Sequence, residues 1–427
     1  MRRLRRGGVP ALLVVAAFIG TGPGLDAPAR PGPDGAAVAP PLRLVAESAP
    51  AACDPRRVAL VDETPYALRR LGARRVWPRA TGAEITVAVV DSGVDPGNTH
   101  LGAAVVPGTS LVPGDPDPTG QTDVTSHGTA VAGIVAAREV PGSGVIGLAR
   151  DARVLPVRVY VSEEQEDVVA GRGPEAARTA AGIRYAADAG ARIIAVPLSS
   201  ALPDPELDTA VAYATAAGSL VVASAGNREE SPDTPDGPRW PAASPDALGV
   251  GAVDTADTVP AQSVRGPHVD VVAPGTDVLT TYFAAGDCAL EPDGGATSWA
   301  TGYAAGAAAL VAQAYPEASP AEIAYRMQVT ADRPVRSARD DARGWGLIQP
   351  LEAVTAGLDP NRAGPPLPGA PTPPATGRAP QRIDVVANRD PAADQKSAGR
   401  WWLLLGGGVV GLALLAAGAR AARRRTG

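Results

Sequence analysis

The chain has 427 residues, with 39 Lys or Arg, 45 Asp or Glu and a formal net charge of −6. This length supplies one large domain with extensions, and the basic residues are scattered except at the two ends, which argues against nucleic-acid binding. Glycine (49 residues) and proline (44 residues) are abundant, whereas aromatic residues make up 4% of the chain. Such a composition is typical of an α/β domain with closely packed small-residue helices.

The N-terminus has the pattern of a secretory signal peptide. The first six residues carry four arginines and no acid, and an apolar run (VPALLVVAAFIG) follows that is too short to span a bilayer comfortably. We therefore predict a signal peptide over residues 1–29, with a buried N-terminal helix as the alternative. An N-terminal extension over residues 30–76 follows, and a domain over residues 77–356.

Within this domain, short strand-like runs alternate with helix-like ones. The predicted strands are mostly apolar and rich in β-branched residues, and they cover residues 85–90, 154–159, 192–196, 219–223 and 269–273. The predicted helices cover residues 127–137, 176–189 and 205–217, with another after Ser298 and one that opens with a capping box at Ser319. This alternation predicts a doubly wound α/β fold, with a mostly parallel sheet and helices on both faces. In such folds the active groups lie beyond the carboxyl ends of the strands.

The C-terminal part of the chain is predicted to be a spacer followed by a membrane helix. Residues 357–400 are dense in Pro, Ala and Gly, which predicts a semi-extended linker. Residues 401–419 contain no charge, and as a helix they cover about 30 Å, about one hydrocarbon core. Four arginines lie within residues 420–427, so the positive-inside rule predicts a cytoplasmic tail and an external domain. A buried core helix is the alternative.

The two cysteines, Cys53 and Cys288, are predicted to form a disulfide. The signal peptide sends the chain to an oxidising compartment, where an even cysteine count favours pairing. The bridge would join the N-terminal extension to a segment just before Ser298. Free thiols are the alternative.

Three segments carry candidate catalytic groups. Asp91 ends a predicted buried strand (VAVVDSGVD), where a carboxylate can orient an imidazole. His127 opens a small-residue helix (SHGTAVAG), and Ser298 lies at the N-terminus of another (ATSWATG), where the helix end favours developing negative charge. Taken singly, a strand followed by a turn explains Asp91 at least as well, and a serine N-cap explains Ser298 better. The other histidines, His100 and His268, have no comparable setting, and we expect them to be surface or structural residues.

Together and in this order, the segments DSGVD, HGTAVAG and ATSWATGYAAGAAALV resemble the Asp, His and Ser boxes of the subtilase (subtilisin-like) family. A fourth segment, ASAGN, which ends at Asn227, resembles the oxyanion box of the family. The resemblance implies that Ser298 attacks the peptide carbonyl, that His127 transfers the proton and that Asp91 orients His127. It also implies that Asn227 stabilises the oxyanion. The substrate cleft implied by the resemblance includes Ser199, Ser200, Ala201, Ala225 and Gly226.

Features at the two ends of the chain resemble one group within the subtilase family. A signal peptide, a GWGLIQPLEAV closing segment, a Pro-rich spacer and one membrane helix with a basic tail resemble the mycosins. Mycosins are membrane-anchored subtilases associated with type VII secretion in actinobacteria. The resemblance implies a serine endopeptidase that cleaves exported proteins outside the cell membrane, with type VII secretion components as partners. The rival hypothesis is a structural subunit that stabilises the secretion complex through the protease fold, without cleavage.

Three positions depart from the subtilase pattern. The family usually has Gly where this chain has Ala296 and Pro where it has Gly302, and Pro197 replaces an Asn of the cleft segment. These differences concern the substrate subsites more than the triad. Calcium, which some subtilases bind, would need acidic ligands at regular spacing, and Asp115, Asp117, Asp123 and residues 163–167 lack that spacing. We therefore expect solvated acidic loops, with no metal or cofactor.

Overall fold

The computed structural model describes residues 53–228, 234–290, 297–335, 337–359, 362–369 and 418. The predicted signal peptide, the first part of the extension, most of the linker, the predicted membrane helix apart from residue 418, and the basic tail lie outside these residues. Within the described part of the chain, no helix combines the length and the apolar character that a membrane crossing requires.

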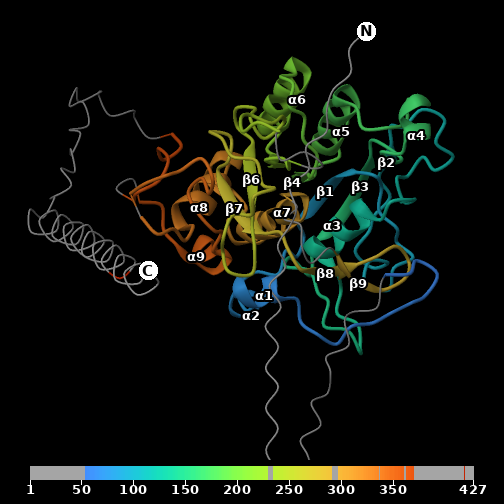
Figure 1. Cartoon of the computed structure of the whole chain (residues 1–427), viewed down its shortest axis with the longest axis horizontal. Helices are drawn as coiled ribbons and strands as arrows, with labels where there is room; N and C mark the ends of the chain where they lie inside the picture. Colours follow the sequence, from blue (N-terminus) through green and yellow to red (C-terminus); the bar gives the residue numbers. More distant parts are fainter. Residues whose placement is uncertain are drawn as a thin grey trace, which may run out of the picture. The chain divides into compact units, whose positions relative to one another are not determined.

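A parallel sheet lies at the centre of the described domain (Figure 1). It has seven strands in the order β2-β3-β1-β4-β5-β6-β7, and all neighbouring strands run parallel. The strands are β1 (Thr86–Asp91), β2 (Thr109–Ser110), β3 (Arg153–Arg158), β4 (Ile193–Val196), β5 (Leu220–Ser224), β6 (Leu248–Val253) and β7 (Val271–Pro274). An antiparallel hairpin of β8 (Val278–Thr281) and β9 (Asp287–Leu290) lies outside this sheet. The predicted doubly wound parallel sheet is confirmed.

Helices cover both faces of the sheet because its strands are apolar on both sides. Val87 and Val89 of β1 pack into one core and Ala88 and Val90 into the other. The first core also contains residues of α1 (Tyr66–Arg70), α2 (Ala73–Val76), α3 (His127–Ala136), α7 (Thr297–Ala314), α8 (Pro320–Thr330) and α9 (Pro350–Thr355). The second core contains residues of α5 (Ala176–Asp188) and α6 (Pro205–Ala216). A short helix, α4 (Gln165–Val169), contributes no buried residue.

The elements that were predicted agree with the structure to within one or two residues. The elements that were not predicted are β2, β6, the β8–β9 hairpin and the short helices α1, α2, α4 and α9. β6 (LGVGAV) was not predicted because its two glycines dilute the β-branched pattern. The β8–β9 hairpin was missed because its strands are short and lie outside the central sheet. The capping box at the start of α8 is confirmed: Ser319 Oγ accepts from the Glu322 N–H, and the Glu322 carboxylate accepts from the Ser319 N–H.

The described part of the N-terminal extension is bound to the β8–β9 hairpin. Ala59 donates its N–H to the carbonyl of Ala285 (2.8 Å) and accepts from the N–H of Asp287 (2.8 Å). Cys53 and Cys288 form a disulfide, with their Cα atoms 5.6 Å apart and 235 residues of sequence separation. The extension is therefore joined covalently to β9, as the cysteine count predicted.

A buried histidine and carboxylate lie beneath this junction. His100 Nε2 is 2.8 Å from Asp287 Oδ1, and His100 Nδ1 is 2.6 Å from the carbonyl oxygen of Arg138. Burial lowers the pKa of His100, but the Asp287 carboxylate and the Arg138 carbonyl more than offset it, so the pKa is raised. Asp287 Oδ2 also accepts from the N–H of Val61 (2.8 Å). Of the two expectations for His100, a surface or a structural residue, the structural one therefore holds.

Candidate active site

Asp91 lies at the carboxyl end of β1, and its side chain is fully buried. Its Oδ1 accepts hydrogen bonds from the N–H of Ser92 (2.6 Å) and from the hydroxyl of Tyr160 (3.2 Å). His127 Nδ1 lies 2.9 Å from Oδ1 and 2.8 Å from Oδ2. A carboxylate at Nδ1 favours the tautomer with its proton on that nitrogen, which leaves Nε2 able to accept a proton.

The first turn of α3 is held in place by the carboxylate of Asp123. Its Oδ1 accepts from the Ser92 hydroxyl (2.9 Å) and the Ser126 N–H (2.9 Å). Its Oδ2 accepts from the Thr129 N–H (2.9 Å) and hydroxyl (2.7 Å). Asp123 thereby ties the turn after Asp91 to the helix that begins with His127. This role was not predicted, although an acidic residue shortly before a helix is a recognisable capping signal.

The expectation of solvated acidic loops is wrong for two of the three aspartates. Asp123 is buried in the network above, and Asp115 forms a buried ion pair with Arg158 (3.0 Å). The reason is that each of these carboxylates is satisfied by local donors, so it can leave solvent. The acidic residues at positions 163, 164 and 166 are exposed, as expected. Among the described residues, no group of three or more His, Cys, Asp or Glu could hold a metal ion.

Small residues let α3 approach its neighbours closely. A Cβ at Gly128 would overlap the carbonyl oxygen of Gly93 in the turn after β1, so a larger residue would push the helix away. Gly302 of α7 lies against Ile134 of α3, and a Cβ at residue 302 would come within 3.0 Å of that side chain. The family usually has Pro at position 302. In this chain the Gly at that position lies in a close contact between α3 and α7. Ala296, the other departure close to Ser298, lies outside the described residues.

The His127 side chain is 24% exposed and is therefore accessible from solvent. Burial lowers its pKa, but the charge and the hydrogen bond of Asp91 raise it by more, with smaller contributions from Asp123 and Glu163. The pKa of His127 thus lies above its ordinary value. Because only the neutral imidazole can accept a proton, activity that depends on His127 is expected to fall on the acid side.

Ser298 is the second residue of α7 and is 6% exposed. The ring of the next residue, Trp299, lies 4.9 Å from the ring of His127, centroid to centroid, so the start of α7 is adjacent to the imidazole. The described side chains of Ser298 and His127 are not hydrogen-bonded to each other in this structure. Catalytic hydrogen bonds are often long in the absence of substrate and tighten when it binds.

Asn227 is fixed in one amide orientation by Thr297. Its Oδ1 accepts from the N–H (3.0 Å) and the hydroxyl (3.1 Å) of Thr297, and that hydroxyl is 2.6 Å from Ser224 Oγ. The acceptor side of the amide is therefore occupied, and Nδ2 is left as a donor beside the start of α7. Thr297 was not predicted as a site residue, and the signal that could have found it was its place directly before Ser298.

Ser199, Ser200 and Ala201 follow β4 and lie near the surface. Ser200 pairs with Trp240 through two backbone hydrogen bonds, with N–O distances of 2.8 and 2.9 Å. Ser199 and Ser200 also border a cavity of about 230 Å³ together with Pro174 and Trp240. This segment is thus held to the chain that follows Asn227 by backbone pairing.

Ala225 and Gly226 lie at the end of β5, next to Ser199. A Cβ placed at Gly226 would be 3.1 Å from Ser199 Oγ, which shows that the two segments are in contact. The side chain of Ala225 is fully buried, and its carbonyl oxygen is 2.9 Å from His268 Nε2. Burial is the main cause of the lowered pKa of His268, which makes it a neutral structural residue.

Comparison with known proteins decides the family. The sequence pattern described as "Subtilase family" matches residues 82–346, more than half of the chain. The chain belongs to the subtilase family. This subtilase is similar to thermitase of Thermoactinomyces vulgaris, at 35% identity over 268 residues, which covers 63% of this chain and 88% of thermitase.

Two further comparisons relate the subtilase to the mycosins. It is 32% identical to Mycosin-1 of Mycobacterium tuberculosis over 349 residues, which covers 71% of this chain and 76% of that protein. Its structure is similar to the crystal structure of MycP1 from the ESX-1 type VII secretion system, with a TM-score of 0.62 and 27% identity over 74% of this chain and 91% of that one. The subtilase is a subtilisin-like serine protease related to the mycosins of type VII secretion. The predicted family and enzyme class are confirmed.

The resemblance assigns Asn227 as an oxyanion donor. On that assignment, replacement of Asn227 by Ala is expected to lower kcat by about 10²–10³, because loss of one oxyanion donor costs about 2.7–4 kcal/mol of transition-state stabilisation. KM should barely change, since the donor acts in the transition state. Asn227→Asp keeps an oxygen for Thr297 but replaces the Nδ2 donor with an anionic oxygen that repels the oxyanion, so it should lose at least as much. An unchanged kcat in Asn227→Ala, measured on a labelled protein substrate, would remove Asn227 from this role.

Replacement of Tyr160 by Phe is expected to shift the acid limb of the kcat/KM profile to higher pH. The Tyr160 hydroxyl stabilises negative charge on Asp91, and without it more of that charge acts on His127, which raises the pKa of the imidazole further. If the interaction between Asp91 and the protonated His127 becomes stronger by about 0.7 kcal/mol, the pKa of His127 rises by about half a unit. Tyr325→Phe, which removes a hydroxyl bonded to the carbonyl of Asp359, should leave the limb in place. A shift to lower pH, or none, would contradict the assignment.

Proposed function

We propose that this subtilase is a membrane-anchored endopeptidase that cleaves exported proteins outside the cytoplasm, in association with a type VII secretion system. The single observation that carries the proposal is the buried Asp91 carboxylate in contact with Nδ1 of a solvent-accessible His127, beside the helix that begins at Thr297. This geometry supports base catalysis at the start of α7, where a serine hydroxyl is available.

The catalytic roles in the proposal combine the contacts of Asp91, His127 and Asn227 with the resemblance to the subtilase motifs. Ser298 Oγ attacks the substrate carbonyl and passes its proton to His127 Nε2, and Asp91 stabilises the imidazolium that forms. Asn227 Nδ2 and the backbone N–H of Ser298 donate to the oxyanion. The Ser298 N–H lies in the first turn of α7, where N–H groups have no partner within the helix. His127 then returns the proton to the leaving amine.

The proposed location of the protein and its proposed partners are supported by the sequence and by a structurally similar protein. Residues 1–29 and 401–419 have the patterns of a signal peptide and a single membrane helix, and apart from residue 418 they lie outside the described residues. The structurally similar protein MycP1 comes from the ESX-1 type VII secretion system, which supports an association of this subtilase with such a system. The Pro-rich residues 357–400 would place the external domain at some distance from the membrane.

A structural role without cleavage is the second candidate. The observation that favours it is the low exposure of Ser298 (6%) together with the lack of a hydrogen bond to His127 in this structure. In that case the protease fold would serve as a docking subunit of the secretion complex.

One pair of experiments separates the two candidates. The full-length chain and its Ser298→Ala variant are treated with a fluorescent fluorophosphonate, which labels activated serines. Labelling of the wild type alone is expected, and equal labelling of both proteins would contradict the role of Ser298. Secretion is then compared between cells with Ser298→Ala and cells without the gene. Loss of secretion in both strains supports required catalysis, whereas normal secretion in the Ser298→Ala cells alone supports the structural role.

A further inference from the structure

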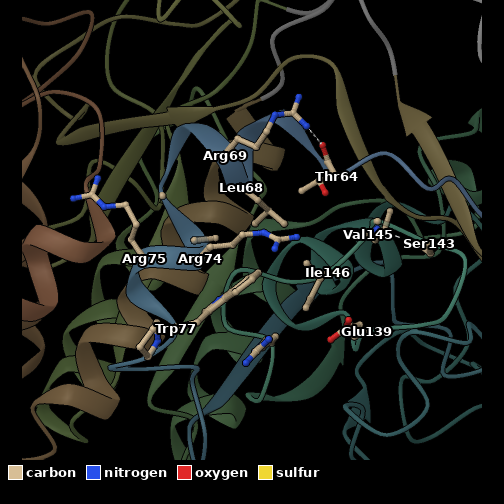
Figure 2. Close-up of a pocket in the computed structure, with 15 residues that line it drawn as sticks. Thr64, Leu68, Arg69, Arg74, Arg75, Trp77, Glu139, Ser143, Val145 and Ile146 are labelled. Atoms are coloured by element: carbon tan, nitrogen blue, oxygen red, sulfur yellow. Dashed lines mark hydrogen bonds between the residues drawn. The ribbon is translucent and has the colours of Figure 1, made fainter.

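A pocket of about 650 Å³ lies beside α1 and α2 (Figure 2). It is bounded on one side by residues 64–78, which precede β1, and on the other by residues 139–150, which follow α3. Asp91 lies at the opposite, carboxyl end of β1, and His127 begins α3, about 15 Å along the helix axis from its last residue. The pocket is therefore separate from the catalytic groups.

The lining of this pocket is basic. It contains four arginines, Arg69, Arg74, Arg75 and Arg150, and one acidic residue, Glu139. The whole chain, in contrast, has a net charge of −6. The pocket is therefore positively charged although the protein as a whole is negatively charged. A recess lined by charges of one sign concentrates ligands of the opposite sign.

The charges of these arginines are largely uncompensated. Arg69 and Arg75 approach exposed glutamates at 3.7 and 3.9 Å, and such long surface pairs contribute little and are easily exchanged. Arg74 and Arg150 form no ion pair with any residue in the described ranges. A carboxylate that enters the pocket therefore finds guanidinium groups available for bidentate pairing.

The pocket also has an apolar surface held in a fixed position. Leu68 and Val145 are buried, and Ile146 and Trp77 are partly exposed. The indole of Trp77 donates its Nε1–H to the carbonyl of Leu148 (2.9 Å), which fixes the ring. A ligand with one apolar side chain can pack against these groups while its charged neighbours contact the arginines.

Two of the arginines lie over this apolar surface. The Arg150 guanidinium is 4.7 Å from the centre of the Trp77 ring. Figure 2 shows Arg74 extending across the pocket toward Val145, whereas Arg75 points away from it. Arg74 and Arg150 are therefore the cations best placed to contact a ligand inside the pocket.

We propose that this pocket binds an acidic peptide segment of a partner protein, with an apolar side chain between Asp or Glu residues. A flat anionic membrane could contact the exposed Arg69 and Arg75, but Arg150 and Trp77 are half-buried inside the recess. An extended peptide can reach them, and its alternating side chains suit a basic rim around an apolar floor. The proposal does not depend on whether the protein cleaves exported substrates.

Fluorescence anisotropy tests the proposal with a labelled, end-blocked peptide, Glu-Glu-Leu-Glu-Glu, and the full-length chain carrying Ser298→Ala to prevent turnover. Binding is expected to be at least tenfold tighter than that of Gln-Gln-Leu-Gln-Gln, and to weaken at high salt. Arg74→Glu with Arg150→Glu should weaken it at least tenfold. Arg74→Glu alone, on an exposed position, should weaken it about threefold, which keeps the test valid if the double variant misfolds.

Arg184→Glu is the matched control. Arg184 also lies over an aromatic ring, 5.5 Å from the centre of Tyr213, but it belongs to α5 on the other face of the sheet, so its replacement should leave binding unchanged. Equal binding of the Gln peptide, or unchanged binding in Arg74→Glu, would overturn the proposal. So would binding to phosphatidylglycerol vesicles without binding to the acidic peptide.

Discussion

Replacement of His127 by Ala is expected to lower kcat by about a millionfold, and Ser298→Ala should lower it by about as much. In the proposed mechanism the two residues act in one proton transfer, because Ser298 attacks only if His127 accepts its proton. The contact of His127 with Asp91 favours Nε2 as the proton-accepting nitrogen. The double variant should therefore be no slower than either single variant. Residual catalysis of about 10³–10⁴ over the uncatalysed rate would remain from the oxyanion donors and binding.

Single-turnover cleavage of fluorescein-labelled casein by the full-length chain measures these rates. Arg184→Glu, in α5 on the far face of the sheet, serves as the unaffected comparison. A His127→Ala variant that retains more than a few per cent of wild-type kcat would show that another group accepts the proton. Additive losses in the double variant would show that the two residues act in separate steps.

Replacement of Cys53 and Cys288 together by Ser is expected to lower the free energy of unfolding by about 5 kcal/mol. The bridge closes a loop with 235 residues of sequence separation, and the chain-entropy model gives about that value for so long a loop. This is a large share of the 5–15 kcal/mol typical of a folded domain. The bridge also holds the segment that pairs with the β8–β9 hairpin through Ala59 and Asp287.

Guanidinium unfolding of the full-length chain under oxidising conditions measures this loss. The wild-type chain under reducing conditions should unfold at the same midpoint as the double variant, because both lack the bridge. A single variant, Cys53→Ser, should also match it. A loss below about 1 kcal/mol would show that the reduced unfolded chain is already constrained.

Elements that depend on local pattern were predictable from the sequence. The apolar, β-branched runs at β1, β3, β4, β5 and β7 predicted strands with polar groups at their carboxyl ends, and Asp91 lies there. The small-residue helices at α3 and α7 were predicted with His127 and Ser298 at their N-termini. In each case the information lies within about ten neighbouring residues, which is the range over which hydrophobic period and capping act.

The subtilase motifs, the two cysteines and the order of the main central strands and helices could be read from the sequence alone. Other features became apparent only in the folded structure: Asp123 anchors the start of α3, Thr297 orients the amide of Asn227, and Tyr160 hydrogen-bonds to Asp91. The burial of Asp115 against Arg158 was likewise decided by folding. The physical reason is that these contacts join side chains from separate elements. Two polar side chains that are far apart in the sequence become hydrogen-bond partners only when packing brings them together and excludes water. The sequence alone does not show which pairs will meet in this way.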